Sequence, residues 1–122
     1  MSSSRINALQ WFGLMAAPLA WATQLVAGYY SAEAHCEATQ WQSGWSPTLL
    51  GMTGGAALVA VAGEIAATAV FLRLRRVSND SAGPPGRQHL FAVGAMVGNV
   101  LFFVAILLGG VTAVALNGCR PA

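Results

Sequence analysis

Three long apolar stretches separated by two polar ones dominate the pattern of this sequence. The middle stretch is the clearest, because it runs from Thr48 to Leu72 with Glu64 as its single charged residue. About 20 consecutive apolar residues are enough for a helix to cross a bilayer, where only internally hydrogen-bonded backbone is stable. We therefore predict an all-α membrane protein, with one domain over residues 1–122 and three transmembrane helices at about 8–30, 48–73 and 89–116.

The first stretch is interrupted by polar residues and by Pro18. Because proline has no amide hydrogen, the carbonyl of Leu14 should lose its helical partner, and we expect a bend there. A cleaved signal peptide is the alternative, since Arg5, a short apolar core and Ala20-Trp21-Ala22 imitate the three parts of such a peptide. The apolar character continues well past the supposed cleavage site, and this favours a retained helix.

Charge predicts which side of the membrane each loop occupies. All six basic residues are arginines, and five of them lie near the N-terminus or around the second loop, namely Arg5, Arg73, Arg75, Arg76 and Arg87. Short arginine-rich loops stay in the cytoplasm. We therefore predict a cytoplasmic N-terminus, an external loop at 31–47, a cytoplasmic loop at 74–88 and a periplasmic C-terminus. The net charge of +2 lacks the dense basic face of a nucleic-acid-binding protein.

The two cysteines, Cys36 and Cys119, fall on the external side in this topology. An oxidising compartment favours a disulfide between them, which would tie the first loop to the C-terminal tail. A copper(I) site formed by both thiolates and His35 is the alternative, because soft ligands favour that ion. His35 and His89 lie on opposite sides of the membrane, so together they could not ligate a haem. We predict no metal or cofactor bound by this chain alone, although haem and copper could occur in partner subunits.

Gln24, Glu64 and Asn99 are the strongly polar residues within the predicted helices. We expect Gln24 and Asn99 to form hydrogen bonds between helices. Glu64 should lie in the inner half of the hydrocarbon, where an ionised carboxylate is costly. Two interpretations of Glu64 remain open. It is either part of a proton path, or a protonated residue hydrogen-bonded to Asn99 or to a partner helix.

Small residues recur at intervals of four in the second and third stretches, a spacing that lets helix backbones approach closely in lipid. The glycines predicted at helix contacts are Gly51, Gly55, Gly94, Gly98 and Gly109. The aromatic residues predicted to face lipid or a neighbouring subunit are Phe91, Phe102 and Phe103.

Two sets of short motifs give the chain a family resemblance. One set comprises Pro18-Leu19-Ala20-Trp21, Gln24, Gly28-Tyr29 and Cys36, and the other comprises Phe91-Ala92, Gly94, Leu101-Phe102 and Cys119. In these positions the chain resembles the small three-helix membrane proteins encoded beside haem–copper cytochrome c oxidases in proteobacteria. The resemblance implies an accessory or assembly role at a terminal oxidase in the inner membrane, with the cysteines in the periplasm. The group tends to carry a polar residue near the middle of its third helix, which here would be Asn99.

The sequence contains no phosphate-binding loop, nucleophile elbow or zinc-binding spacing, and we predict no enzymatic activity. We expect a non-catalytic accessory subunit of a respiratory terminal oxidase or a related respiratory complex, located in the bacterial inner membrane. Its partners would be lipid and larger respiratory subunits, without nucleic acid. The alternatives are an assembly or copper-delivery factor using Cys36, Cys119 and His35, and a small oligomeric transporter or channel gated by Glu64.

Overall fold

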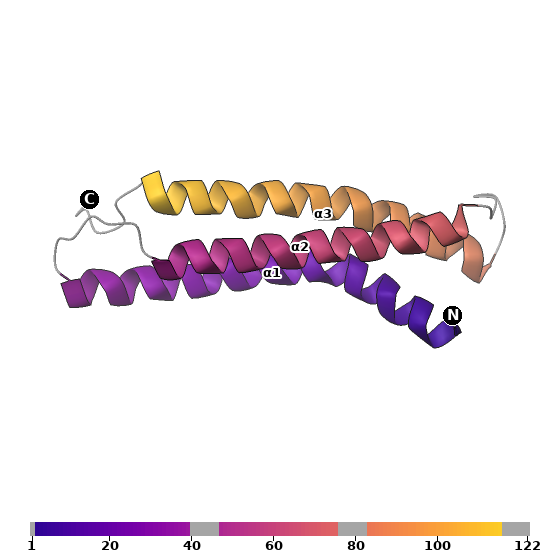
Figure 1. Cartoon of the computed structure of the whole chain (residues 1–122), viewed down its shortest axis with the longest axis horizontal. Coiled ribbons are helices and arrows are strands. Elements are labelled where there is room, and N and C mark those ends of the chain that lie inside the picture. Colours follow the sequence, from indigo (N-terminus) through magenta and orange to yellow (C-terminus); the bar gives the residue numbers. More distant parts are fainter. Residues whose placement is uncertain (1, 40–46, 76–82, 116–122) are drawn as a thin grey trace.

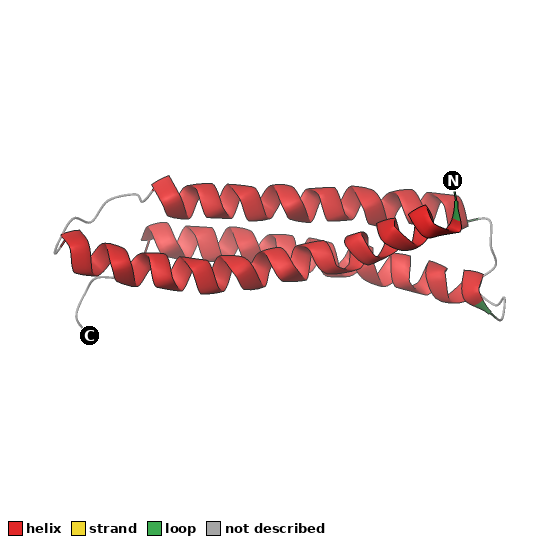
Figure 2. Cartoon of the chain, turned by 90° about the horizontal axis from the view of Figure 1, so that it is seen from below, coloured by secondary structure: helices red, strands yellow, loops and turns green. Residues whose placement is uncertain are grey.

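The computed structural model describes residues 2–39, 47–75 and 83–115, and almost all of them are helical. Helix α1 spans Ser3–Thr39, α2 spans Pro47–Leu74 and α3 spans Pro84–Ala115. The helices lie side by side in an elongated bundle, in which α2 runs opposite to α1 and α3 (Figure 1). Figure 2 shows that the described residues outside helices lie only at helix ends. The predicted all-α architecture with three helices is confirmed.

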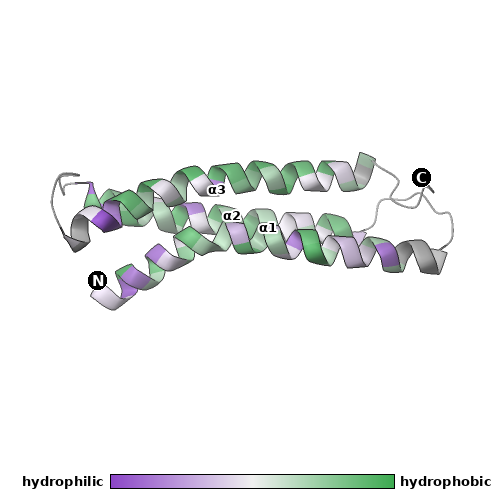
Figure 3. Cartoon of the chain, turned by 180° about the vertical axis from the view of Figure 1, so that it is seen from behind, coloured by the Kyte–Doolittle hydropathy of each residue, from purple (hydrophilic) through white to green (hydrophobic). Residues whose placement is uncertain are grey.

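Two of the helices are long and apolar enough to cross a membrane. The candidate spans are Pro47–Leu74 and Gly86–Ala113, each of 28 residues. At the rise of an α-helix such a segment is about 42 Å long, which exceeds the hydrocarbon thickness of about 30 Å. Large apolar side chains cover the outer faces, and Leu58 and Leu90 are 72% and 69% exposed. Figure 3 shows that hydrophobic residues predominate along α2 and α3. Such surfaces indicate a membrane protein.

Helix α1 is not among the candidate spans. Pro18 and Gln24 interrupt its apolar character, and it is longer than predicted. Residues 31–39, which the sequence pattern assigns to the start of the external loop, continue the helix. They begin with Ser31-Ala32-Glu33-Ala34, in which alanine and glutamate have high helix propensity, and they contain neither glycine nor proline. A membrane crossing by α1 stays a prediction.

Helix α3 also begins earlier than predicted, at Pro84 rather than at His89. The assignment of the Pro84-Pro85 pair to a loop is therefore wrong. Proline fits the first turn of a helix, because the amide hydrogens there have no partner within the helix and the fixed φ suits its start. Gly83 precedes the helix with a φ of 116°, a backbone conformation that favours glycine. The pair therefore starts a helix.

Helix α1 is bent. Its N-terminal part turns away from the axis of the remainder (Figure 1). Pro18 lies inside the helix. Its missing amide hydrogen frees the carbonyl of Leu14, and its ring opens the helix on the N-terminal side of the proline. The bend agrees with the prediction from the sequence.

Small residues form the contact between α1 and α2. A Cβ atom added at Gly13 would lie 3.0 Å from the backbone nitrogen of Ala67, and one added at Gly63 would lie 3.0 Å from the Cβ of Ala16. These distances leave no room for a larger side chain without a shift of the helices. The buried residues of α2 are Ala56, Ala60, Gly63, Ala66, Ala67 and Val70.

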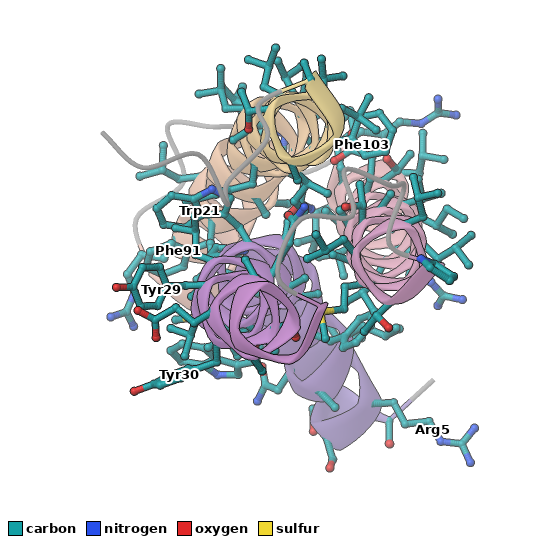
Figure 4. The ribbon with its side chains drawn as sticks, turned by 90° about the vertical axis from the view of Figure 1, so that its left-hand side faces the viewer. Arg5, Trp21, Tyr29, Tyr30, Phe91 and Phe103 are labelled. Atoms are coloured by element: carbon teal, nitrogen blue, oxygen red, sulfur yellow. The ribbon has the colours of Figure 1, made fainter. Side chains whose placement is uncertain are left out.

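Larger side chains fill the space between α1 and α3. The rings of Trp21 and Phe102 pack there at a centroid distance of 5.5 Å, and the fully buried Ile106 forms a core cluster with Ala17, Ala56 and Ala60. Phe102 and Phe103 are half-buried and pack against the core, so the expectation that they face lipid or a neighbouring subunit holds at most for their exposed parts. Figure 4 shows Phe103 on the side of α3 that faces α2. Phe91, in contrast, is 49% exposed.

Candidate functional site

Gln24 of α1 bridges all three helices near one end of the bundle. Its Nε2 atom donates a hydrogen bond to Thr53 Oγ1 of α2 and another to the carbonyl of Ile106 of α3, both at 3.1 Å. An amide nitrogen carries two hydrogens, so both are used. Thr53 donates its own hydrogen to the carbonyl of Leu49 at 3.0 Å, and this leaves a lone pair of Oγ1 for Gln24. Gln24 thus forms the expected interhelical hydrogen bonds, one to α2 and one to α3.

Two adjacent glycines of α3 contact this polar cluster, and Gly110 makes room for Thr53. A Cβ atom at Gly109 would lie 3.5 Å from Gln24 Nε2, and one at Gly110 would lie 2.5 Å from Thr53 Cγ2. Gly109 was predicted at a helix contact and lies at one. Gly110 was not predicted at a helix contact, although a Gly-Gly pair within an apolar helix is a usable signal.

Asn99 of α3 lies at the level where α1 and α2 approach each other closely. It is 2% exposed, and its Nδ2 atom donates a hydrogen bond to the carbonyl of Gly13 at 2.9 Å. A Cβ atom at Gly63 of α2 would lie 3.6 Å from Asn99 Nδ2 and 3.7 Å from Oδ1. The amide of Asn99 therefore lies in contact with α2 at Gly63 while it binds α1 at Gly13.

Glu64 follows Gly63 and is half-buried. Its Oε2 atom and Asn99 Oδ1 are both buried without a hydrogen-bond partner among the described residues. Asn99 Nδ2 donates to Gly13, and no hydrogen bond joins Asn99 to Glu64 among the described residues, so both interpretations of Glu64 stay predictions. Two acceptor atoms thus lie unpaired in the interior of this part of the bundle.

His89 lies nearer the other end of the bundle, between α2 and α3. It is 9% exposed, and its ring packs against Phe71 at a centroid distance of 5.2 Å. A histidine at the very start of a membrane helix would instead be solvated. The difference follows from the early start of α3, which places His89 within the helix and turns it toward α2.

The two ends of the bundle differ in composition. The described arginines are all exposed and belong to the N-terminus of α1, the C-terminus of α2 and the N-terminus of α3, namely Arg5, Arg73, Arg75 and Arg87. Figure 1 places these three helix ends together, and Figure 4 shows Arg5 pointing away from the bundle. Toward the opposite end of α1, Tyr29 and Tyr30 point outward with exposed fractions of 64% and 67%.

Four of the glycines predicted at helix contacts do not lie at one within the chain. A Cβ atom added at Gly51, Gly55, Gly94 or Gly98 would meet nothing within 4 Å. The close contacts involve Gly13, Gly63 and Gly110 instead. The four-residue spacing was correct as a signal for close packing in α2, since Gly63 and Ala67 are so spaced, but it did not identify which glycines face the other helices.

The side chains of His35 and Cys36 and the whole of Cys119 lie outside the described residues. The disulfide and the copper site therefore stay predictions. Among the side chains that the structure describes, no group of three or more histidine, cysteine, aspartate or glutamate residues could hold a metal ion. The chemistry that the described part offers is hydrogen bonding by amide and carboxyl groups inside an apolar bundle.

Compared with protein-family models, with curated proteins and with solved structures, the chain matches none.

Proposed function

We propose that the chain is a non-catalytic membrane subunit that packs against larger subunits of a respiratory terminal oxidase or a related respiratory complex and stabilises that assembly. In this proposal α1 crosses the bacterial inner membrane together with α2 and α3. Support for a third crossing comes from its contacts with both apolar helices and from its length of 37 residues. A polar residue such as Gln24 is tolerated in a membrane helix when its donors are bound inside the bundle.

The proposed orientation has the N-terminus in the cytoplasm and the C-terminus in the periplasm. The support is the exposed arginines at one end of the bundle, which include Arg5, Arg73 and Arg87. Arginine-rich segments beside short membrane helices are retained in the cytoplasm. The tyrosines toward the other end of α1 suit the outer interface, where their rings can lie in the apolar region while their hydroxyls reach water.

The observation that carries the structural role is the contrast between the interior and the outer faces. The side-chain amides of Gln24 and Asn99 are turned inward, where they join helices to one another. The outer faces carry large apolar side chains and exposed glycines, including Gly51 on α2 and Gly94 on α3. Exposed glycines in an apolar helix allow the backbone of another membrane helix to approach closely.

The choice of a respiratory oxidase as the partner rests on the resemblance to the small three-helix proteins encoded beside haem–copper oxidases. The bundle adds a physical constraint on such a partner. It must present apolar helices rather than a polar surface, because the exposed faces of α2 and α3 offer dispersion contacts and few hydrogen-bonding groups.

Affinity purification from native membranes tests this proposal. A tagged chain, extracted in a mild detergent, should co-purify with subunits of a haem–copper oxidase. The double variant Gly94→Leu/Gly98→Leu should lose a large part of this association, since a Cβ atom at either position meets nothing within 4 Å in the chain and the added side chains would block a helix outside it. Leu101→Val serves as the matched control, because it alters an exposed apolar residue of the same helix without filling a glycine position.

Two results would contradict the proposal. One is recovery of the folded chain without any respiratory subunit from membranes that contain an active oxidase. The other is co-purification with a complex of a different class, such as a solute transporter. Equal recovery of oxidase with the double variant and with the control would instead show that the partner does not contact α3 at Gly94 and Gly98.

The buried carboxyl of Glu64 favours a second candidate function, a small proton-conducting oligomer. Carboxyl groups inside membranes often belong to proton paths. The purified chain in liposomes would then conduct protons down an imposed gradient, and Glu64→Gln would abolish the flux. Absence of flux from the wild-type chain would exclude this candidate.

A further inference from the structure

Glu64 Oε2 and Asn99 Oδ1 share an unusual property. They are the two buried side-chain nitrogen or oxygen atoms that lack a hydrogen-bond partner within the described part of the chain. A buried acceptor without a donor is costly in any protein interior, and the cost is larger where no water can reach it. The presence of two such atoms in one small bundle calls for a common explanation.

The two atoms belong to the same level of the bundle, on neighbouring helices. Gly63 packs directly against the amide of Asn99, since a Cβ atom added at Gly63 would lie 3.7 Å from Oδ1. Glu64 is the next residue of α2, and consecutive Cα atoms are about 3.8 Å apart. The side chain of Glu64 has three rotatable bonds with which to turn its carboxyl group toward α3.

A donor from outside the chain does not fit this site. Glu64 is half-buried, but its Oε2 atom is buried and Asn99 is 2% exposed, so neither a partner helix nor bulk water reaches these two atoms in the conformation found. An arginine does not fit either. Arg73 is the nearest arginine along α2, nine residues away, which corresponds to about 13.5 Å along the helix axis.

A metal ion is also a poor occupant. Hard cations take about six or more oxygen ligands. The site offers the carboxyl of Glu64 and Oδ1 of Asn99, whereas the nearby carbonyl of Gly13 already accepts a hydrogen bond from Asn99 Nδ2. Other carbonyls at this level belong to residues in the middle of helices and accept hydrogen bonds from their own helix.

A single proton resolves both unpaired acceptors. We propose that the interior of the bundle contains a proton-binding pair, in which Glu64 is a neutral carboxylic acid and its Oε2–H group donates to Asn99 Oδ1. Asn99 then joins the three helices, since it donates to Gly13 of α1 and accepts from Glu64 of α2. This arrangement parallels the cluster around Gln24, which joins the same helices at another level. The inference concerns the chain itself and holds whether or not the proposed partner is correct.

Infrared spectroscopy of the purified chain in lipid at neutral pH tests the inference. The wild type should show the C=O stretching band of a protonated carboxylic acid. The difference spectrum against Glu64→Gln should assign this band to Glu64, because that variant keeps the size and hydrogen-bonding capacity of the neutral acid and so preserves the fold. Absence of such a band from the difference spectrum would overturn the proposal, since Glu64 would then be ionised.

A second measurement identifies the acceptor. In Asn99→Ala the Glu64 band should move to higher wavenumber, because the hydrogen bond to its O–H group is lost. Should that variant not fold, Glu64→Asp gives the same information, since the shorter acid would lie out of reach of Asn99 and its band should also lie higher. Glu33→Gln is the control and should leave the band unchanged, because Glu33 is exposed toward the far end of α1. A band that stays in place in both Asn99→Ala and Glu64→Asp would rule out Asn99 as the partner.

Discussion

Asn99 and Gly13 are joined by a hydrogen bond of 2.9 Å from the side-chain amide of one to the main-chain carbonyl of the other, across 86 residues of sequence. The bond ties α3 to α1 at a point where neither residue could be replaced freely. Gly13 has no space for a side chain, and Gly63 packs against both Ala16 and the amide of Asn99. A polar side chain and two glycines on three different helices therefore form one structural unit.

Replacing Asn99 should weaken the bundle. We expect Asn99→Leu to lower the free energy of unfolding by about 1 to 3 kcal/mol, because the hydrogen bond is lost and the branched side chain does not fit against Gly63. Titration with a denaturing detergent, followed by circular dichroism, measures this change. Val100→Leu is the matched control on the exposed side of α3 and should leave stability nearly unchanged. Equal stability of both variants would show that the bond to Gly13 contributes nothing.

Gly110 should tolerate no side chain. The Cβ atom of Gly110→Ala would clash with Thr53 Cγ2, and Thr53 cannot rotate without breaking its hydrogen bonds to Leu49 and Gln24. We expect a loss of about 1 to 3 kcal/mol in the same unfolding measurement, which is typical of overpacking. Gly54→Ala is the control, because it makes the same change where nothing lies within 4 Å. A Gly110→Ala variant as stable as the control would contradict the tight contact between α2 and α3.

Gln24 and Thr53 should be energetically coupled. Hydrogen bonds between membrane helices contribute on average about 0.6 kcal/mol each, so Gln24→Leu, which removes two, should cost about 1 kcal/mol. Thr53→Val removes the acceptor while keeping the shape of the side chain. In the double variant the two losses should not add, and the coupling should be about 0.6 kcal/mol. Fully additive losses would mean that the two side chains do not interact.

Reporter fusions test the orientation. A reporter inserted at Gly83, between α2 and α3, should be active only in the cytoplasm, and one fused after Ala122 only in the periplasm. The exposed arginines that flank Gly83, Arg75 and Arg87, motivate this expectation. Removal of charge provides the control, since replacing both arginines by glutamine should weaken the preference of the Gly83 reporter for the cytoplasm. Periplasmic activity at Gly83 in the unmodified chain would overturn the proposed topology.

The sequence was sufficient to predict three helices because the signal is local. A long apolar stretch has one stable form in a membrane, and the observed α2 differs from its predicted bounds by a single residue at each end. The C-terminal end of α1 and the N-terminal end of α3 were harder to predict from the sequence. Whether Ala- and Glu-rich residues 31–39 extend a helix, or whether Pro84 starts one, depends on turn geometry that the apolar pattern does not contain.

The contacts between helices could be predicted only in part. Gln24 and Asn99 were recognised because a strong polar group in an apolar helix must find a partner. Each of them donates to a carbonyl of a distant helix, and any residue type can supply a carbonyl. Likewise, the four-residue spacing identified pairs of glycines, but the rotation of each helix about its axis decides whether Gly55 or Gly63 meets a neighbouring helix. That rotation is set by the packing of all three helices together.

The small residues between α1 and α2 also determine how freely the side chains of the bundle can move. Alanine and glycine have no rotamers to lose, so burying residues such as Ala60 and Ala67 carries almost no cost in side-chain entropy. The leucines that have many rotamers, such as Leu58 and Leu90, remain on the outside. The helices can thus join one another while these outer side chains keep their conformational freedom. Only when another helix packs onto the bundle would that freedom be lost, at about 0.5 to 1 kcal/mol for each leucine.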